Sequence, residues 1–219
     1  MIDVAAFDMA GTTVEDGASV LEAFDRVLDL AELDGTKRVS ARNYVVETMG
    51  QSKIEVFTHL FGERASELNH AFEGLFREVV DERGAREIPG VRLFVEDLIE
   101  RGVRVGLTTG FSPETRELLI ERLGWNDLFR VRVSPVDAGR GRPFPDMIWH
   151  CARELAVTDI TRSAAFGDTP SDITSARRAG VGLVVGVLSG TGTRDDFAAL
   201  GVAHVLASVV ESGELLANW

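Results

Sequence analysis

The chain has 219 residues, of which 45% are hydrophobic and 26% are charged, a composition typical of a soluble globular protein. Its formal net charge of −12 argues against nucleic acid or an anionic membrane as its main partner. An anionic substrate would therefore need a local site that offers a metal ion, an arginine or helix N-termini.

The single cysteine, Cys151, excludes an intrachain disulfide and fits a reducing compartment. The first residues lack the pattern of a signal peptide, and no apolar run approaches the ~20 residues of a membrane span. We therefore expect a cytoplasmic protein that binds neither membrane nor nucleic acid.

The first expected elements are a buried strand and a block of helices. The run IDVAAF at 2–7 ends at Asp8 and Gly11, which predicts a buried parallel strand leading into a loop. From about 18 to 83 the apolar residues have helical spacing, with no convincing strand. Within this block we expect one helix over about 19–33 and another over 65–82. Between them we expect two helices, with Ser40 and Ser52 as their N-cap residues.

After the IPGV segment at 88–91, strand and helix patterns alternate, which predicts an α/β fold with a doubly wound parallel sheet. The helical block interrupts this order after the first strand, so we interpret it as an inserted cap. The expected domains are a core of residues 1–16 and 85–219 and a cap of 17–84. Strands are expected at 103–109, 131–135, 162–168, 181–188 and 203–205, and helices at 91–101, 113–123, 145–155, 171–179, 194–200 and 208–217.

Three polar residues lie at the carboxyl ends of predicted strands. In doubly wound sheets, ligands bind beyond these ends. Asp8 precedes AGTT and suits a nucleophile or a metal ligand, although it could equally cap the turn before Gly11. Thr109, in GLTTGFS, places a hydroxyl at the end of a strand. Asp168, in GDTPSD, lies four residues before Asp172, and this pair suits Mg²⁺ or an acidic helix start.

The loop GRGRPFP carries Arg140 and Arg142. A fixed arginine in this loop could neutralise a phosphoryl oxygen, whereas a solvated loop arginine would have no such role. The sequence alone leaves the two readings open.

These four segments, in this order, resemble the haloacid dehalogenase superfamily of hydrolases. The resemblance implies that Asp8 is a nucleophile that forms a phospho-aspartyl intermediate, while Thr109 and Arg142 hold the phosphoryl group. It also implies a Mg²⁺ cofactor, and the implied metal site consists of Asp8, the carbonyl of Ala10, Asp168 and Asp172, the last acting directly or through water.

Most phosphatases of that superfamily carry a second Asp two residues after the nucleophile, which protonates the leaving alkoxide. Here the position is Ala10, and loss of a general acid lowers a rate by about 10²–10⁴. Either another group supplies the proton, or the leaving group is not an alkoxide.

The DxAGTT segment, the arginine of GRPFP, TTGF and MGQSKI at 49–54 together resemble the phosphonatase subgroup, which hydrolyses phosphonoacetaldehyde. The resemblance implies that Lys53 forms a Schiff base with the substrate aldehyde. Lysine is rare here, with Lys37 and Lys53 the only two among 23 basic residues, and arginine cannot form an imine. The implied substrate-binding residues are Gly11, Thr12, Met49, Gly50, Gly110 and Phe111.

The chain departs from that subgroup at two positions near these motifs. Val56 stands where phosphonatases have a histidine, with His59 one helical turn further on, and Phe111 stands where they have a tyrosine. The substrate would then be phosphonoacetaldehyde or a related 2-oxoalkylphosphonate.

Three other functions remain alternatives. A phosphomonoesterase for a small phosphorylated metabolite would use Lys53 only to bind its substrate. A dehalogenase would have no use for the GDTPSD acids, and a non-catalytic protein would not need the full set of motifs. The resemblance to phosphonatase also implies a possible homodimer through the cap.

Overall fold

The computed structural model describes residues 2–15 and 18–219, so the predicted domain boundary between 16 and 17 lies outside the described residues. Six parallel strands form one sheet in the order β3-β2-β1-β4-β5-β6. The strands are β1 (Val4–Asp8), β2 (Arg104–Thr108), β3 (Val131–Val133), β4 (Ser163–Gly167), β5 (Leu183–Val187) and β6 (His204–Leu206).

The centre of the sheet is apolar because both of its faces are covered. Every residue of β1 and β4 is buried, and Phe7 pairs in register with Phe166, with stacked rings 4.9 Å apart. Ala5 and Phe7 belong to one hydrophobic core, whereas Ala6 belongs to a second. This alternation is expected for a strand between two layers of helices.

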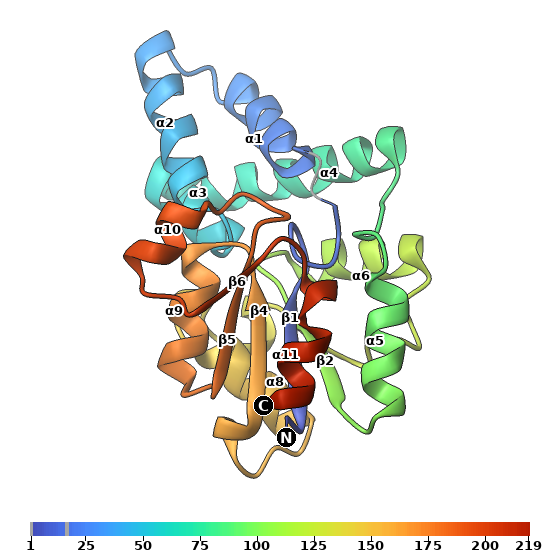
Figure 1. The fold of residues 1–219 in the computed structure, drawn as a ribbon. Helices are drawn as coiled ribbons and strands as arrows, with labels where there is room; N and C mark the ends of the chain where they lie inside the picture. The colour runs from blue at the N-terminus through green and yellow to red at the C-terminus, as the bar shows by residue number, and fades with distance from the viewer. Residues whose placement is uncertain (1, 16–17) are drawn as a thin grey trace.

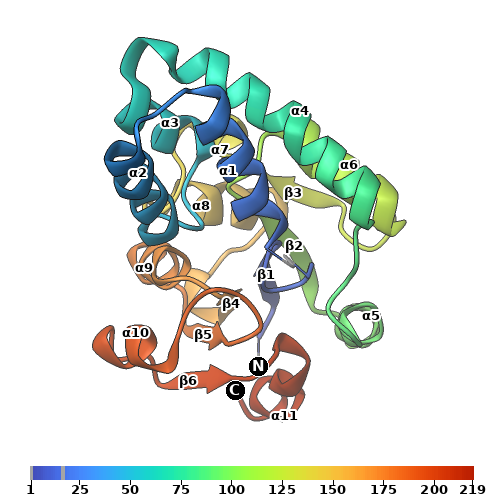
Figure 2. The same cartoon turned by 90° about the horizontal axis from the view of Figure 1, so that it is seen from above.

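The two layers are visible in Figure 2, where α8 (Asp146–Glu154) and α9 (Pro170–Ala179) lie on one face of the sheet and α5 (Val91–Glu100) and α11 (Gly213–Asn218) lie on the other. The other core elements are α6 (Pro113–Leu123), α7 (Pro135–Ala138), α10 (Arg194–Ala199) and the 3₁₀ helices η2 (Ile160–Arg162) and η3 (Val209–Ser212). The doubly wound parallel sheet is therefore confirmed.

Several predicted strands are longer than the observed ones: the strands expected at 103–109, 162–168 and 181–188 each lose one or two residues at each end, and 131–135 loses its last two. The strand expected at 131–135 ends at Val133, because Ser134 and Asp137 form a capping box that starts α7, with Pro135 in its first turn.

Between β1 and α5 the chain forms a helical cap above the carboxyl ends of the strands (Figure 1). On α1, Phe24 packs against Phe57 and Phe72, at ring distances of 5.1 and 4.7 Å. The apolar face of α1 is thus buried inside the cap itself. The cap elements are α1 (Ser19–Leu30), α2 (Gly35–Glu47), α3 (Lys53–Phe61), η1 (Gly62–Arg64) and α4 (Ala65–Arg83).

The second helix of the cap domain starts before Ser40, the residue expected to be its N-cap. Asp34 caps it by accepting a hydrogen bond from the Lys37 amide, at 2.9 Å. Only Ala41 and Val45 are buried along this helix, so the helix shows little apolar periodicity in the sequence. In the described parts of the chain, no helix has both the length and the apolar character needed to cross a bilayer.

Candidate active site

The carboxyl ends of β1 and β4 bring three acids together. Asp8 is the last residue of β1, Asp168 follows β4 directly, and Asp172 lies in the first turn of α9. All three are buried, and ligand atoms of the three carboxylates lie within 4.8 Å of one another. The predicted convergence at this edge of the sheet is therefore present.

Asp172 has two tasks at once. Its Oδ2 accepts hydrogen bonds from the amide and the hydroxyl of Thr169, at 3.0 and 2.5 Å, which forms the capping box of α9. Its Oδ1 lies 2.7 Å from Arg142 Nε. The sequence left two interpretations of Asp172, an acidic helix start or a carboxylate of the site. Asp172 is both.

Arg142 is the arginine of the GRGRPFP loop that enters the site. Its side chain is 2% exposed, and its Nη2 lies 2.8 Å from Asp8 Oδ1. The guanidinium also donates to the carbonyl and the hydroxyl of Thr108, at 3.0 and 2.9 Å, and to the Gly50 carbonyl, at 3.2 Å. Arg140, by contrast, is half exposed and pairs with Asp146.

The acid cluster fits a divalent cation. Asp168 Oδ2 accepts hydrogen bonds from the amide and the hydroxyl of Thr191, at 2.8 and 3.3 Å. Its Oδ1 is buried and has no hydrogen-bond partner among the described residues. An orphaned buried carboxylate oxygen beside two further carboxylates matches the oxygen ligands that Mg²⁺ prefers. Asp8, Asp168 and Asp172, with the Ala10 carbonyl, would hold the ion.

The same crowding shifts two pKa values upward. Burial, aided by the charge of Asp172, raises the pKa of Asp168 to about 7, although the Thr191 amide and Arg142 oppose the shift. Burial also raises the pKa of Asp8 well above its usual range, against the effect of Arg142. A bound cation would favour the ionised forms of both carboxyl groups.

A small cavity of about 30 Å³ lies between these residues and the cap. This volume holds a few waters. The cavity is lined by Asp8, Ala10, Val20, Met49, Gly50, Lys53, Thr109, Gly110, Phe111, Arg142, Asp168, Thr169 and Thr191.

Two residues expected to bind substrate do not line this cavity. Gly11 has a φ of +84°, and a Cβ there would lie 2.5 Å from Asp168 Oδ2, so this glycine lets the loop pass close to the acid cluster. Thr12 is fully buried, and its hydroxyl has no hydrogen-bond partner among the described residues. Gly11 thus lies behind the acid cluster and not in the cavity wall.

The cap supplies the wall opposite Asp8. Lys53 is the first residue of α3 and is only 7% exposed, and its Nζ lies 5.2 Å from the centre of the Phe111 ring. Cap and core also approach each other closely at two glycines that line the cavity. A Cβ on Gly50 would lie 2.5 Å from Thr169 Oγ1, and one on Gly110 would lie 2.5 Å from the Gln51 carbonyl oxygen.

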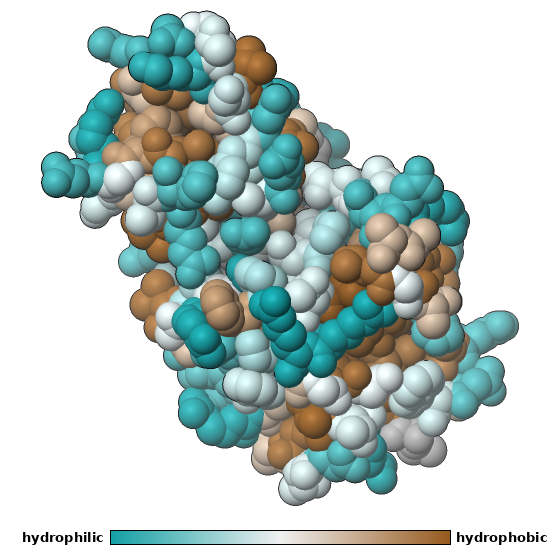
Figure 3. Space-filling model, turned by 90° about the vertical axis from the view of Figure 1, so that its left-hand side faces the viewer, coloured by the Kyte–Doolittle hydropathy of each residue, from teal (hydrophilic) through white to brown (hydrophobic). Residues whose placement is uncertain are grey.

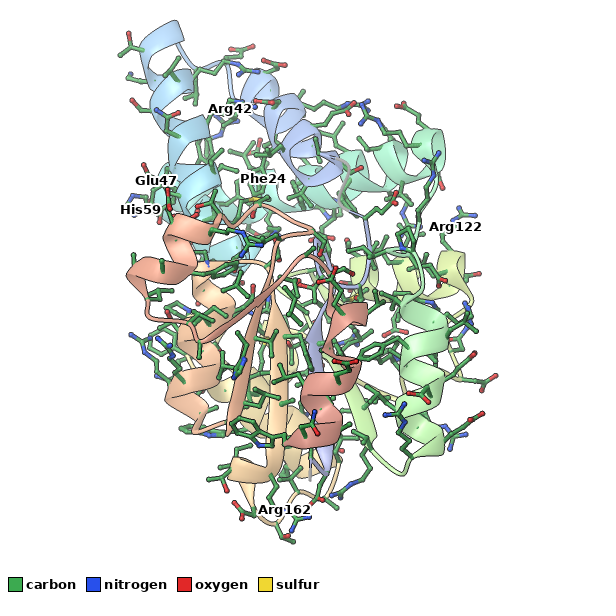
Figure 4. The ribbon with its side chains drawn as sticks, viewed as in Figure 1. Phe24, Arg42, Glu47, His59, Arg122 and Arg162 are labelled. Atoms are coloured by element: carbon green, nitrogen blue, oxygen red, sulfur yellow. The ribbon has the colours of Figure 1, made fainter. Side chains whose placement is uncertain are left out.

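His59 is not part of this wall. Its ring stacks on Tyr44 at 4.1 Å, and the side chain is exposed beside Glu47 on the outer side of the cap (Figure 4). Val56, at the position of the phosphonatase histidine, is buried. The ionisable residues that line the cavity are Asp8, Lys53, Arg142 and Asp168.

The sequence analysis missed Val20, Thr169 and Thr191 as cavity residues. Thr191 had a usable signal, because the segment SGTGT follows β5 at the same edge of the sheet as Asp8 and Asp168. Val20 had none, since it resembles any other apolar residue of a cap helix.

Comparisons with known proteins identify the family of the chain. Residues 2–180 match the family of haloacid dehalogenase-like hydrolases. The chain belongs to this family. It is a hydrolase with a phosphonatase-like sequence. It is 31% identical to the phosphonoacetaldehyde hydrolase of Bacillus mycoides (strain KBAB4), over 87% of this chain and 77% of the relative. The phosphonoacetaldehyde hydrolase of Bacillus cereus (strain AH820) is 29% identical, over 98% of this chain and 84% of the relative.

Two solved structures share the fold. A phosphonoacetaldehyde hydrolase-like protein from Oleispira antarctica superposes with a TM-score of 0.82 at 23% identity, covering 99% of this chain and 92% of its own. A hydrolase from Pseudomonas syringae gives a TM-score of 0.86 at 19% identity, covering 100% and 99%. Both comparisons extend over the cap as well as the core.

Proposed function

We propose that the protein hydrolyses the carbon–phosphorus bond of phosphonoacetaldehyde or a related 2-oxoalkylphosphonate. The observation that carries this proposal is the position of Lys53, a buried primary amine on the wall of the cavity that also contains Asp8. The relatives named phosphonoacetaldehyde hydrolase support the same substrate class.

In the first step, the Lys53 amine adds to the substrate carbonyl and water leaves, which forms an iminium ion. An Asp8 carboxylate oxygen then attacks phosphorus, and the carbon–phosphorus bond breaks. Its electron pair moves onto carbon and forms an enamine with the iminium nitrogen. Protonation of the enamine carbon and hydrolysis of the resulting imine release acetaldehyde and restore the lysine. Water hydrolyses the phospho-aspartate to phosphate.

The surrounding residues supply charge and position. In this proposal Arg142 and Thr109, which line the cavity, would hold the phosphonate oxygens, and the Arg142 bond to Asp8 would orient the nucleophile. A Mg²⁺ ion held by the three acids would neutralise charge on the phosphoryl group. Ala10 leaves no carboxyl group to protonate an alkoxide, and a carbon leaving group needs none at that place.

The second candidate is a phosphatase for a small phosphorylated metabolite, in which Lys53 only binds the substrate anion. It is favoured by the phosphoryl-transfer groups themselves, since Asp8, Thr109 and Arg142 would serve a phosphate ester equally well.

Two variants separate the candidates: Lys53→Arg, and Lys37→Arg as a matched control, because Lys37 is three-quarters exposed on α2. Release of acetaldehyde and phosphate from phosphonoacetaldehyde is measured with Mg²⁺. Borohydride added during turnover should trap the substrate carbon on Lys53, as seen by peptide mass spectrometry.

The proposal expects equal amounts of both products from the wild type and Lys37→Arg, and none from Lys53→Arg. If all three proteins cleave p-nitrophenyl phosphate and none releases acetaldehyde, the phosphatase candidate replaces the first.

The proposal includes a homodimer through the cap. The α1 face is buried within the cap, so the surface in question is the groove between α2 and α3, lined in part by Leu33, Tyr44 and Phe61. Figure 3 shows apolar surface gathered on this side of the cap among hydrophilic residues. Light scattering of the eluting protein gives its mass, and a monomer at all concentrations would contradict the dimer.

A further inference from the structure

The carboxylate of Glu73, a residue of the cap domain, accepts hydrogen bonds at the N-terminus of a core helix. Glu73 lies on α4, and its Oε2 accepts hydrogen bonds from Ser112 Oγ, at 2.8 Å, and from Thr115 Oγ1. Ser112 is the N-cap of α6, and its Oγ accepts from the Thr115 amide, at 3.2 Å. A carboxylate at a helix N-terminus is electrostatically favourable, so cap and core are joined at this point.

The helix that Glu73 caps begins directly after the substrate loop. Thr109, Gly110 and Phe111 all line the cavity, and Ser112 is the next residue. The Phe111 ring lies 5.0 Å from the ring of Phe76, three residues after Glu73 on α4, and 5.2 Å from Lys53 Nζ. One face of α4 therefore contacts Phe111, which faces Lys53, and the helix start that follows it.

The contact is not explained by stability alone. Glu73 Oε1 is buried and, in the part of the chain that the structure describes, accepts no hydrogen bond. An unsatisfied buried carboxylate oxygen is unfavourable, and a smaller apolar residue would avoid this cost. Figures 1 and 2 both show α4 of the cap running beside α6 of the core.

We propose that Glu73 is a positioning residue for the reaction. By accepting hydrogen bonds from Ser112 and Thr115, Glu73 fixes the position of the cap on the 109–112 loop. This position determines where the Lys53 amine lies relative to the Asp8 carboxylate. The inference rests on the proposed function, because carbon–phosphorus cleavage needs the cap lysine and the core acid together. Transfer of the phosphoryl group of a simple phosphate ester to Asp8 needs no Schiff base with Lys53.

The test compares kcat/KM for phosphonoacetaldehyde and for p-nitrophenyl phosphate in Glu73→Ala and in Thr115→Val, which keeps the shape of Thr115. Loss of a charge-assisted hydrogen bond predicts about a tenfold lower kcat/KM for phosphonoacetaldehyde in Glu73→Ala. The phosphate ester should change by less than about twofold. Thr115→Val should lie between, and the double variant should be no worse than Glu73→Ala.

Asp81→Asn is the matched control. Asp81 pairs with Arg122 at 2.6 Å, between the same two helices, but both side chains are half exposed and lie away from the loop. This variant should leave the ratio of the two activities unchanged. A proportional loss on both substrates in Glu73→Ala, or the same shift of the ratio in Asp81→Asn, would overturn the positioning role.

Failure of the proposed function would give a different result from failure of this inference. A wild-type protein that releases no acetaldehyde removes the proposed function, and this inference with it, before any variant is compared. Thr115→Val keeps the test valid if Glu73→Ala does not fold.

Discussion

Arg142 and Asp8 form a buried ion pair, with 2.8 Å between Nη2 and Oδ1 and side-chain exposures of 2% and 7%. The same guanidinium pairs with Asp172 at 2.7 Å, so one cation holds two carboxylates that would otherwise repel each other. The Asp8 carboxylate, the α9 helix start and the Gly50 carbonyl of the cap are all held by this one side chain.

Replacing Arg142 by Ala should destabilise the metal-free protein by about 3–5 kcal/mol, because it leaves two buried carboxylates unpaired. Arg140→Ala removes a charge two residues away, from an exposed pair with Asp146, and should change the free energy of unfolding by no more than about 0.5 kcal/mol. Urea unfolding in the presence of a chelator measures both. Equal losses in the two variants would contradict the assigned role of Arg142.

Asp168 should make the stability depend on pH and on magnesium. Its pKa is raised in the folded state to about 7, so its contribution to stability is full below the unfolded pKa near 3.8 and is lost as the pH rises through about 7. In a chelator, the Tm of the wild type should therefore fall more between pH 5 and 8 than the Tm of Asp168→Asn. Adding Mg²⁺ at pH 8 should raise the Tm of the wild type only.

Protons compete with the cation, so the Mg²⁺ effect should shrink as the pH drops below about 7. An equal rise in Tm for Asp168→Asn would show that the ion binds elsewhere.

The sequence predicted the sheet well because its strands are short apolar runs that end in polar, chemistry-bearing residues. Asp8, Thr109 and Asp168 could be placed at one edge from this rule alone. The start of α2 was misplaced because that helix buries only Ala41 and Val45 and so carries almost no periodic signal.

Side-chain partners within the site were less predictable. Nothing in GLTTGFS distinguishes Thr108, which accepts from Arg142, from Thr109, which faces the cavity. Glu73 looks like any polar residue of an amphipathic helix, and its contact with Ser112 depends on how the cap sits on the core. Such contacts arise from tertiary packing between segments 39 residues apart.

Gly110→Ala should impair turnover without unfolding the protein. The added Cβ would lie 2.5 Å from the Gln51 carbonyl oxygen and 3.0 Å from that of Gly50, so it pushes the cap loop away from the core. A displacement of about 1 Å in such a site can cost about 10²-fold in rate, and we expect a loss of that order in kcat/KM.

Gly74→Ala is the comparison for that variant. Gly74 lies inside α4, and no atom lies within 4 Å of a Cβ built there. This variant should gain about 0.5–1 kcal/mol of stability and keep its activity. If Gly110→Ala were as active as Gly74→Ala, the close approach of cap and core would have no role in turnover.

His59→Gln should leave kcat/KM within about twofold of the wild type, because the ring stacks on Tyr44 outside the cavity. The measurement is steady-state turnover of phosphonoacetaldehyde across pH. A large loss, or the disappearance of one limb of the pH profile, would place His59 in the proton transfer chain after all.

The glycines along the boundary of cap and core make the shape of each part depend on the other. Gly50 leaves room for Thr169 of the core, and Gly110 leaves room for the backbone of Gln51 in the cap. Each part therefore restricts the substitutions that the other tolerates at the boundary. A cap transplanted from a relative would close on this core only if its loop followed the same backbone path. New substrate preferences are therefore more accessible through substitutions inside the existing cap than through exchange of the cap as a module.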